Sequence, residues 1–252
     1  MNIDAPKLCQ ISDLRDLWQE AFGDTDQFLD DFFTSAFSRD RCRCVEIDGT
    51  IAAALYWFDC SCDNQRIAYL YAIATAKAYR GQGLCRKLMD DTHHHLRSLG
   101  YDGALLVPSS KELFAFYERD GYTVCSCIGA LSCFASQENI SLHVISSEEY
   151  AIRRRNFLPE NGVIQEEENL RFLQTQVSFY TTASTLLAAR REGNTLYGAE
   201  LLGDISQAPA ITGALSCTAG EFRITEGDTP FAMYYPLTKT AFPPSYFGLA
   251  FD

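Results

Sequence analysis

The sequence contains no run of apolar residues close to the roughly 18 that a membrane-spanning helix needs. Its first residues also lack the basic stretch and apolar segment of a secretory signal, so we expect a cytoplasmic protein. Basic residues are scarce as well: in 252 residues, 21 Lys and Arg stand against 33 Asp and Glu, and the net charge is −12. Such a chain repels nucleic acid and anionic lipid and attracts cations. Small molecules, and neither nucleic acid nor membranes, are therefore the expected partners.

Several motifs of nucleotide and metal sites are missing too. The chain has no G-x-x-x-x-G-K-[ST] for nucleotide hydrolysis and no G-x-G-x-x-G for dinucleotide binding. Its ten cysteines include three C-x-C pairs but no C-x₂₋₄-C pair of a zinc site, so we interpret them as buried or half-buried thiols. The run His93–His95 falls inside an expected helix, where neighbours diverge by about 100° and cannot bind one ion. We place these histidines on the surface and expect no metal.

The hydrophobic pattern of the first half predicts a mixed α/β domain. Asp48-Gly49 is typical of a tight hairpin turn, and the nearly continuous apolar segment 66–75 is typical of a strand buried on both faces. In chain order we expect helices at 14–22 and 28–38, strands at 43–47, 50–58 and 66–75, a helix at 84–99, a strand at 104–107, a helix at 110–120 and a strand at 122–134.

The second half follows a polar stretch at 135–141 and resembles a shortened copy of the first. Gly193-Asn194 predicts another hairpin turn. The expected elements are helices at 148–158 and 167–180, a hairpin of 185–190 with 195–202, a helix at 206–215 and a strand pair at 221–225 and 231–236. We therefore predict two domains, residues 1–137 and 138–252.

One segment is typical of an anion site. The strand at 66–75 leads through Arg80-Gly81-Gln82-Gly83 into a helix beginning at Leu84. Unpaired amides and the helix dipole favour a negative ligand there, and the glycines let the backbone approach it closely. Arg80 and Arg86 add positive charge, so a pyrophosphate is the expected ligand. The alternative is a helix that begins after a glycine-rich turn and binds nothing.

The residues of this loop resemble a known family. Tyr79–Cys85 (YRGQGLC) resembles the (Q/R)-x-x-G-x-(G/A) loop of the GCN5-related N-acetyltransferases (GNAT), and Leu113–Tyr122 (LFAFYERDGY) resembles their second motif, LYEKxGF. The opening RDLWQEAFGDTDQF and the closing YFGLAFD are similar to those of a two-domain GNAT group with a degenerate second GNAT-like domain. The resemblance implies the α/β, mixed-sheet GNAT acyl-CoA N-acyltransferase fold, in tandem with a shortened GNAT-like C-terminal domain.

The resemblance also implies acetyl-CoA as co-substrate, without a metal. Backbone groups of Ile73, Ala74 and Thr75 would pair with the pantetheine arm, and Tyr117 would protonate the departing thiolate. The residues implied to hold the pyrophosphate are Arg80, Gly81, Gln82, Gly83, Leu84, Cys85 and Arg86. Cys85 departs from the family's Gly or Ala, and under oxidising conditions its thiol is a candidate for a mixed disulfide with CoA. For Tyr117, the alternative is a core aromatic residue.

Direct attack on a thioester needs a neutral amine, so a general base is required. The strand at 66–75 contains no carboxylate. Glu46 and Asp59 on the preceding hairpin are candidates. The apolar C-terminal segment 246–252 is predicted to dock on the protein, and Asp252 would then bring two carboxylates.

The predicted function is an acetyl-CoA-dependent N-acetyltransferase that acts on a small cationic amine or a protein amine by direct attack in a ternary complex. The second half lacks the glycine-rich loop, so one CoA site per chain is expected. The alternatives are a non-catalytic module that binds CoA or acyl-CoA, and an acyltransferase with a longer acyl group or an alcohol acceptor. The sequence does not decide between a monomer and a homodimer.

Overall fold

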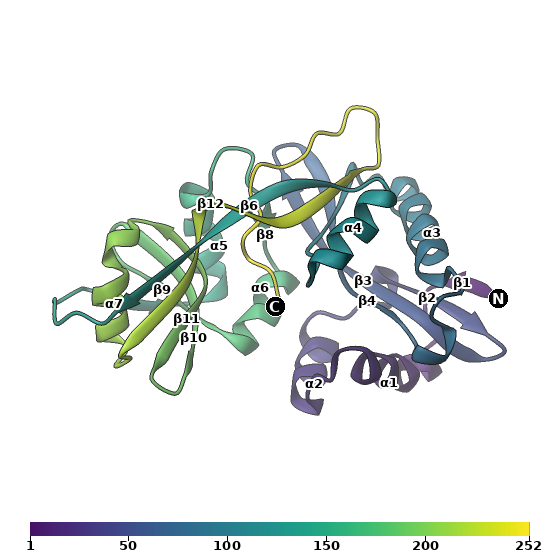
Figure 1. Cartoon of the computed structure of the whole chain (residues 1–252), viewed down its shortest axis with the longest axis horizontal. Helices are drawn as coiled ribbons and strands as arrows, with labels where there is room; N and C mark the ends of the chain where they lie inside the picture. Colours follow the sequence, from purple (N-terminus) through teal and green to yellow (C-terminus); the bar gives the residue numbers. More distant parts are fainter. Residues whose placement is uncertain (252) are drawn as a thin grey trace. The chain divides into compact units, whose positions relative to one another are not determined.

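The computed structural model describes residues 1–251, which divide into two compact units (Figure 1). Unit 1 comprises Met1–Leu106, Glu112–Tyr122 and Tyr234–Pro243; unit 2 comprises Val107–Lys111, Thr123–Met233 and the residues from Pro244 on. Residues 123–137, which the sequence assigned to the first domain, thus pack in unit 2. Among residues 1–251, no helix has the length and apolar character needed to cross a membrane.

Unit 1 is a mixed sheet with helices on both faces, which confirms the predicted fold class. Its elements are β1 (Asn2–Asp4), α1 (Ile11–Phe22), α2 (Asp26–Ser35), β2 (Cys42–Ile47), β3 (Thr50–Cys62), β4 (Gln65–Thr75), α3 (Leu84–Ser98), β5 (Gly103–Leu106) and α4 (Lys111–Arg119). The strands lie in the order β1-β2-β3-β4-β5, with β1 to β4 antiparallel and β5 parallel to β4. Within this unit, α1 and α2 cover one face and α3 and α4 the other (Figure 1).

Local sequence explains the hairpin that begins the sheet. Asp48 (φ 49°) and Gly49 (φ 83°) both adopt the left-handed conformation, as the two-residue turn between β2 and β3 requires. This prediction is confirmed. An aromatic layer fixes α1 on the sheet, because Trp18 lies 5.1 Å from the ring of Tyr56 and 5.6 Å from that of Tyr71.

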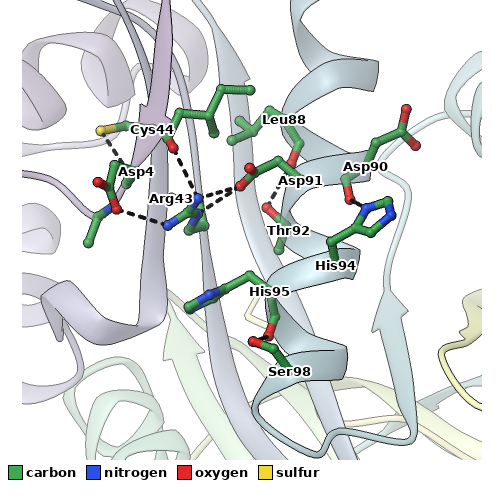
Figure 2. Close-up of polar contacts among 12 residues, drawn as sticks. Asp4, Arg43, Cys44, Leu88, Asp90, Asp91, Thr92, His94, His95 and Ser98 are labelled. Atoms are coloured by element: carbon green, nitrogen blue, oxygen red, sulfur yellow. Dashed lines mark hydrogen bonds and ion pairs between the residues drawn. The ribbon is translucent and has the colours of Figure 1, made fainter.

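Arg43 on β2 binds side chains of both β1 and α3 (Figure 2). From β2, its Nε and Nη2 donate to Asp91 on α3 at 2.9 and 2.6 Å, and its Nη1 donates to Asp4 on β1 at 3.1 Å. The arginine is 9 % exposed, so these charge-assisted bonds also satisfy donors that have little access to water. They hold the beginning of the chain and α3 in a fixed position on β2.

His93 does not lie on the surface, and the prediction for that histidine is wrong. It is 4 % exposed because it follows the buried Met89 by one helical turn on the inner face of α3. Its Nε2 lies 2.7 Å from the hydroxyl of Tyr122, and its ring stacks on Tyr235 at 4.2 Å. Burial, followed by the charges of Arg97 and His94, lowers the pKa of His93 to about 4, so the ring is neutral near pH 7.

Unit 2 has strands and helices of its own. Its elements are β6 (Thr123–Phe134), β7 (His143–Ile145), α5 (Ser147–Phe157), β8 (Ile164–Gln165), α6 (Glu168–Gln176), β9 (Ser178–Thr181), β10 (Thr185–Glu192), β11 (Thr195–Gly203), α7 (Ala208–Ala214) and β12 (Ala219–Pro236). The strand order is β12-β11-β10-β9-β7, with β6 also paired to β12. That this half derives from a second GNAT-like domain stays a prediction.

Two elements of unit 2 differ from those expected. The helix predicted at 167–180 ends at Gln176, and the β-branched and aromatic residues after it form β9, which pairs with β10. The strand pair predicted around Gly227 is a single strand, β12. At Gly227 a Cβ atom would lie 2.3 Å from the Cα of Gly129 on β6. Gly227 therefore allows two strands to approach each other closely and does not form a turn.

The C-terminal segment docks within unit 2, as predicted for the part that the structure describes. Tyr246, Phe247 and Leu249 are each at most 2 % exposed. Ser126 accepts a hydrogen bond from the amide of Phe247 at 2.9 Å and donates to its carbonyl at 3.1 Å. Gln165 donates to the carbonyl of Leu249 at 2.8 Å. The segment is therefore held by backbone hydrogen bonds as well as by apolar packing.

A buried ion pair supports this docking. Arg154 donates to both carboxylate oxygens of Glu200 at 2.7 and 2.8 Å, and its Nη1 donates to the carbonyl of Val163 at 2.8 Å. The hydroxyls of Tyr150 and Tyr246 also donate to Glu200, at 2.9 and 3.1 Å. Both charges are almost fully buried, at 2 % and 0 % side-chain exposure. The network thus links α5, β11 and the C-terminal segment.

Glu200→Gln is expected to lower the free energy of unfolding by about 3 kcal/mol, because it leaves the buried Arg154 without a countercharge and turns amide hydrogens toward it. Urea denaturation measures the change. The double variant Arg154→Met, Glu200→Leu removes both charges and is expected to lose less. If the unfolding free energy of Glu200→Gln fell by the same amount as that of the double variant, or by less, this account of the ion pair would be contradicted.

Candidate active site

The site begins where β4 extends past its pairing with β5. The parallel register runs from Ile67 opposite Gly103 to Tyr69 opposite Leu105, whereas β4 continues to Thr75. Across the sheet β4 stays paired with β3, where Ala53 lies opposite Thr75. The last residues of β4 therefore lie beyond the end of this ladder, where an extended ligand can pair with its backbone.

A bulge distorts β4 at this point. Tyr71 pairs with Tyr56 and Ala74 with Ala54, so two residues of β4, Ala72 and Ile73, stand opposite one residue of β3. Ala72 has φ 47°, a conformation that costs a non-glycine residue on the order of 1 kcal/mol or more. Bulges raise the local twist and often occur next to active sites. Here the bulge lies immediately before the segment that extends past β5.

The loop after β4 presents backbone amides. Gly83 is the N-cap of α3 with φ 74°, and Gly81 has φ 76°. No side chain caps the helix, and its first turn contains no acidic residue. A Cβ at either glycine would meet no atom within 4 Å, so the space in front of the loop is open. The first turn of this 15-residue helix is thus uncapped, as the predicted anion site requires.

These features surround one cavity of about 540 Å³. Its wall combines the end of β4, the loop, the start of α3, the end of α1 and one face of α4. The lining residues are Ala21, Phe22, Ile73, Ala74, Thr75, Tyr79, Arg80, Gly81, Gly83, Leu84, Cys85, Arg86, Phe116 and Arg119. Every residue predicted to bind CoA lines it except Gln82, whose side-chain amide donates to the carbonyl of Ala78 at 3.4 Å. Their roles in binding stay predictions.

The cavity is positive in an acidic chain, since its lining holds three arginines and no carboxylate. Arg86 donates to Asp120 through Nε at 2.7 Å and Nη2 at 2.5 Å, so its charge is largely compensated. Arg80 donates to the carbonyl of Thr75 at 3.0 Å, and Arg119 donates to the carbonyl of Ala115 at 3.0 Å. The charges of these two side chains are therefore available to an anionic ligand.

The predicted acid, Tyr117, lies on α4 beside the cavity and not in its lining. The residue is 7 % exposed, and its ring packs against those of Phe116 and Tyr122 at 5.2 and 5.7 Å. Its hydroxyl has no hydrogen-bond partner among residues 1–251. Burial, then Cys85 and Asp120, raise the pKa of Tyr117 well above the usual value of tyrosine. The side chain therefore keeps its proton near pH 7 and can donate it or a hydrogen bond.

Cys85 is half-buried in the loop. Burial raises the pKa of its thiol to about 11; Asp120 adds to this effect and Arg86 opposes it. Because the thiolate is the reactive form, the cysteine is nearly inert near pH 7. A mixed disulfide of Cys85 with CoA would accordingly form slowly.

The candidate bases lie outside the cavity lining. Glu46 accepts hydrogen bonds from Lys7 at 2.9 Å and Gln10 at 2.7 Å, and these bonds lower its pKa. Asp59 accepts hydrogen bonds from Tyr101, from Arg41 at 3.3 Å and from Arg66 at 3.2 Å. The lowered pKa makes Glu46 a poor proton acceptor. Asp252 lies outside the described residues. Within residues 1–251, no three His, Cys, Asp or Glu side chains gather as metal ligands would.

The part of the chain that contains this loop also identifies the protein family. Residues 2–125 match the family model of the acetyltransferase (GNAT) domain. The first half of the chain is a GNAT acetyltransferase domain. Membership places it among the acetyl-CoA-dependent acyltransferases. No curated protein sequence matches the chain.

Several solved structures share the fold over most of the chain, beyond the first domain. A GCN5-related N-acetyltransferase from Kribbella flavida has TM-score 0.72 at 15 % identity, covering 92 % of this chain and 70 % of its own. A GCN5-related N-acetyltransferase from Anabaena variabilis has TM-score 0.71 at 13 % identity, and the match covers 94 % of this chain and 73 % of that one. Eis1 from Mycobacterium abscessus has TM-score 0.69 at 12 % identity, with 94 % and 74 % covered.

Sequence reasoning missed part of the cavity. Tyr79 precedes the loop, while Phe116 and Arg119 lie inside the second GNAT motif, so motif position alone could have suggested them. Ala21 and Phe22 end α1 and carry no such signal. They reach the cavity only because α1 packs across β3 and β4.

Proposed function

We propose that the protein transfers the acetyl group of acetyl-CoA to a primary amine by direct attack in a ternary complex. The observation that carries the proposal is the single cavity shared by the end of β4 and the uncapped amides of α3. The first can pair with an amide-containing arm and the second can bind a pyrophosphate, and CoA joins these two groups in one molecule.

In this proposal the backbone of Ile73–Thr75 pairs with pantetheine and places the thioester beside the bulge at Ala72. Amides of residues 81–86 bind the pyrophosphate. The amine attacks the carbonyl carbon, backbone donors stabilise the oxyanion, and the C–S bond breaks as the thiolate leaves. Tyr117 donates a hydrogen bond or its proton to that thiolate.

The proposed acceptor is a small cationic molecule or an exposed protein amine. A net charge of −12 favours the approach of cations to the protein. In this proposal the positive cavity binds the anionic co-substrate and not the acceptor. Release of CoA thiol, followed with a chromogenic disulfide over a panel of amines, tests this function. Acetyl-CoA binding without release for any small or peptide amine would contradict it.

A second candidate is a module that binds CoA or acyl-CoA without turnover. It is favoured by the position of Tyr117 outside the cavity lining and by the hydrogen bonds that occupy Glu46 and Asp59. The thiol-release assay separates the two functions, because the module would bind acetyl-CoA and release no thiol in the presence of an amine.

We further propose that Asp252 provides the general base. Deleting Phe251 and Asp252 is then expected to lower kcat about tenfold or more, since one base contributes about that much or more to proton removal. Asp252→Asn is the matched control, because it keeps Phe251, which packs on Phe172 at 5.3 Å, and also keeps the terminal carboxylate. Thiol-release kinetics measure both variants. Unchanged kcat after the deletion would remove Asp252 from the mechanism.

A further inference from the structure

We propose that Phe116 and Arg119 on α4 form the subsite for the 3′-phosphoadenosine end of CoA, which would make Arg119 the residue that distinguishes CoA from dephospho-CoA. The inference rests on the proposed function, since it assumes that CoA occupies the cavity. Neither residue belongs to the loop or to the end of β4, and their placement comes from α4 alone.

The two side chains lie on the same face of α4. They are three residues apart, so they project from one side of the helix, and both line the cavity that the loop also lines. Tyr117 and Glu118 between them do not line it. Phe116 is half-buried and Arg119 is exposed, as expected for an aromatic ring and a cation at the open end of a binding site.

The end of α4 is fixed next to the loop. Asp120, the residue after Arg119, accepts the hydrogen bonds of Arg86 at 2.7 and 2.5 Å, and Arg86 belongs to the first turn of α3. This pair holds α4 against the anion-binding end of α3. A ligand whose pyrophosphate lies on the amides of α3 therefore has Arg119 in the wall of the same cavity.

The charges of CoA and of the cavity arginines indicate which group Arg119 binds. CoA carries a pyrophosphate and, separately, a phosphate on the 3′ oxygen of its ribose. The amides of α3 suit the pyrophosphate, and Arg80 lies on the same side because its Nε donates to the carbonyl of Thr75 at the end of β4. Arg86 is compensated by Asp120. Arg119 forms no ion pair with any residue of 1–251, and its Nε bond to Ala115 leaves both Nη groups to face a phosphate.

Phe116 supplies the second half of the subsite. Its ring stands nearly perpendicular to that of Tyr117, at 79° and a centroid distance of 5.2 Å, so neighbouring packing sets its orientation. Aromatic rings bind a nucleobase by stacking, irrespective of the base. An adenine stacked on Phe116 would place the attached ribose phosphate about one helical turn along α4, next to Arg119.

The test is calorimetric titration with CoA and with dephospho-CoA, two ligands that differ only by the 3′-phosphate. Wild-type protein is expected to bind CoA about tenfold more tightly, because an arginine–phosphate contact is charge-assisted and the site is open to solvent. Arg119→Met keeps the aliphatic length and is expected to reduce this ratio to about one. Arg80→Met is the matched control, expected to weaken both ligands and to keep the ratio.

Phe116→Leu separates stacking from charge, because it is expected to weaken CoA and dephospho-CoA by the same factor of about five. Equal binding of the two ligands by wild-type protein, or an unchanged ratio in Arg119→Met, would overturn the subsite while leaving the CoA site intact. Loss of the ratio in Arg80→Met would assign the 3′-phosphate to Arg80 and equally overturn it. Failure of wild type to bind either ligand would reject the proposed function together with this inference.

Discussion

Gly83→Asp is expected to weaken acetyl-CoA binding at least 100-fold, on the order of 3 kcal/mol. Gly83 has φ 74°, which strains any L side chain, and its Cβ would enter open space in front of the α3 amides. The new carboxylate would occupy the position proposed for the pyrophosphate and repel it. Calorimetric titration of the purified variant with acetyl-CoA measures the loss.

The matched control is Gly193→Asp in the hairpin of unit 2. Gly193 also has a positive φ, 59°, and open space around its Cβ, so the substitution imposes similar backbone strain and the same charge. We expect wild-type affinity in this variant. Binding by Gly83→Asp within a few-fold of wild type would show that the pyrophosphate does not lie on the loop.

Tyr117→Phe is expected to lower kcat about 100-fold, with acetyl-CoA affinity unchanged. The ring packs in the core and phenylalanine preserves that packing, so only the unpartnered hydroxyl is lost. Thiol-release kinetics with a responsive amine give kcat, and calorimetry gives affinity. Because its raised pKa keeps Tyr117 protonated, kcat of the wild type is not expected to fall from ionisation of this residue as the pH rises to 10.

A tyrosine outside the site provides the comparison. Tyr197→Phe removes a hydroxyl from β11 in unit 2 and is expected to leave kcat unchanged. If Tyr117→Phe also retained wild-type kcat, Tyr117 would be a core aromatic residue, and another donor would have to protonate the thiolate.

Local signals in the sequence sufficed for most of unit 1. The Asp48-Gly49 turn, the continuous apolar strand β4 and the glycines before α3 each act within a few residues, and the structure contains all three elements. The loop residues were found for the same reason: an anion site at a helix N-terminus is built from one short segment. The loop by itself predicts a pyrophosphate, whereas the prediction of acetyl-CoA followed from the family motifs.

Features that depend on distant contacts were missed. The bulge at Ala72 arises from strand geometry that no local pattern encodes. His93 lies on the inner face of α3, and Tyr235, far away in the sequence, stacks on it; the charged residues around His93 gave no sign of this contact. Residues 219–236 were predicted as two strands because the close approach of Gly227 to Gly129 on β6 is invisible without the fold.

The crystal structure of the protein with bound CoA tests the central claim most directly. The account predicts pyrophosphate oxygens within hydrogen-bond distance of the amides of residues 81–86, and pantetheine paired with the backbone of Ile73–Thr75 in the one cavity. CoA bound elsewhere on the chain, or an empty cavity at saturating CoA, would contradict it.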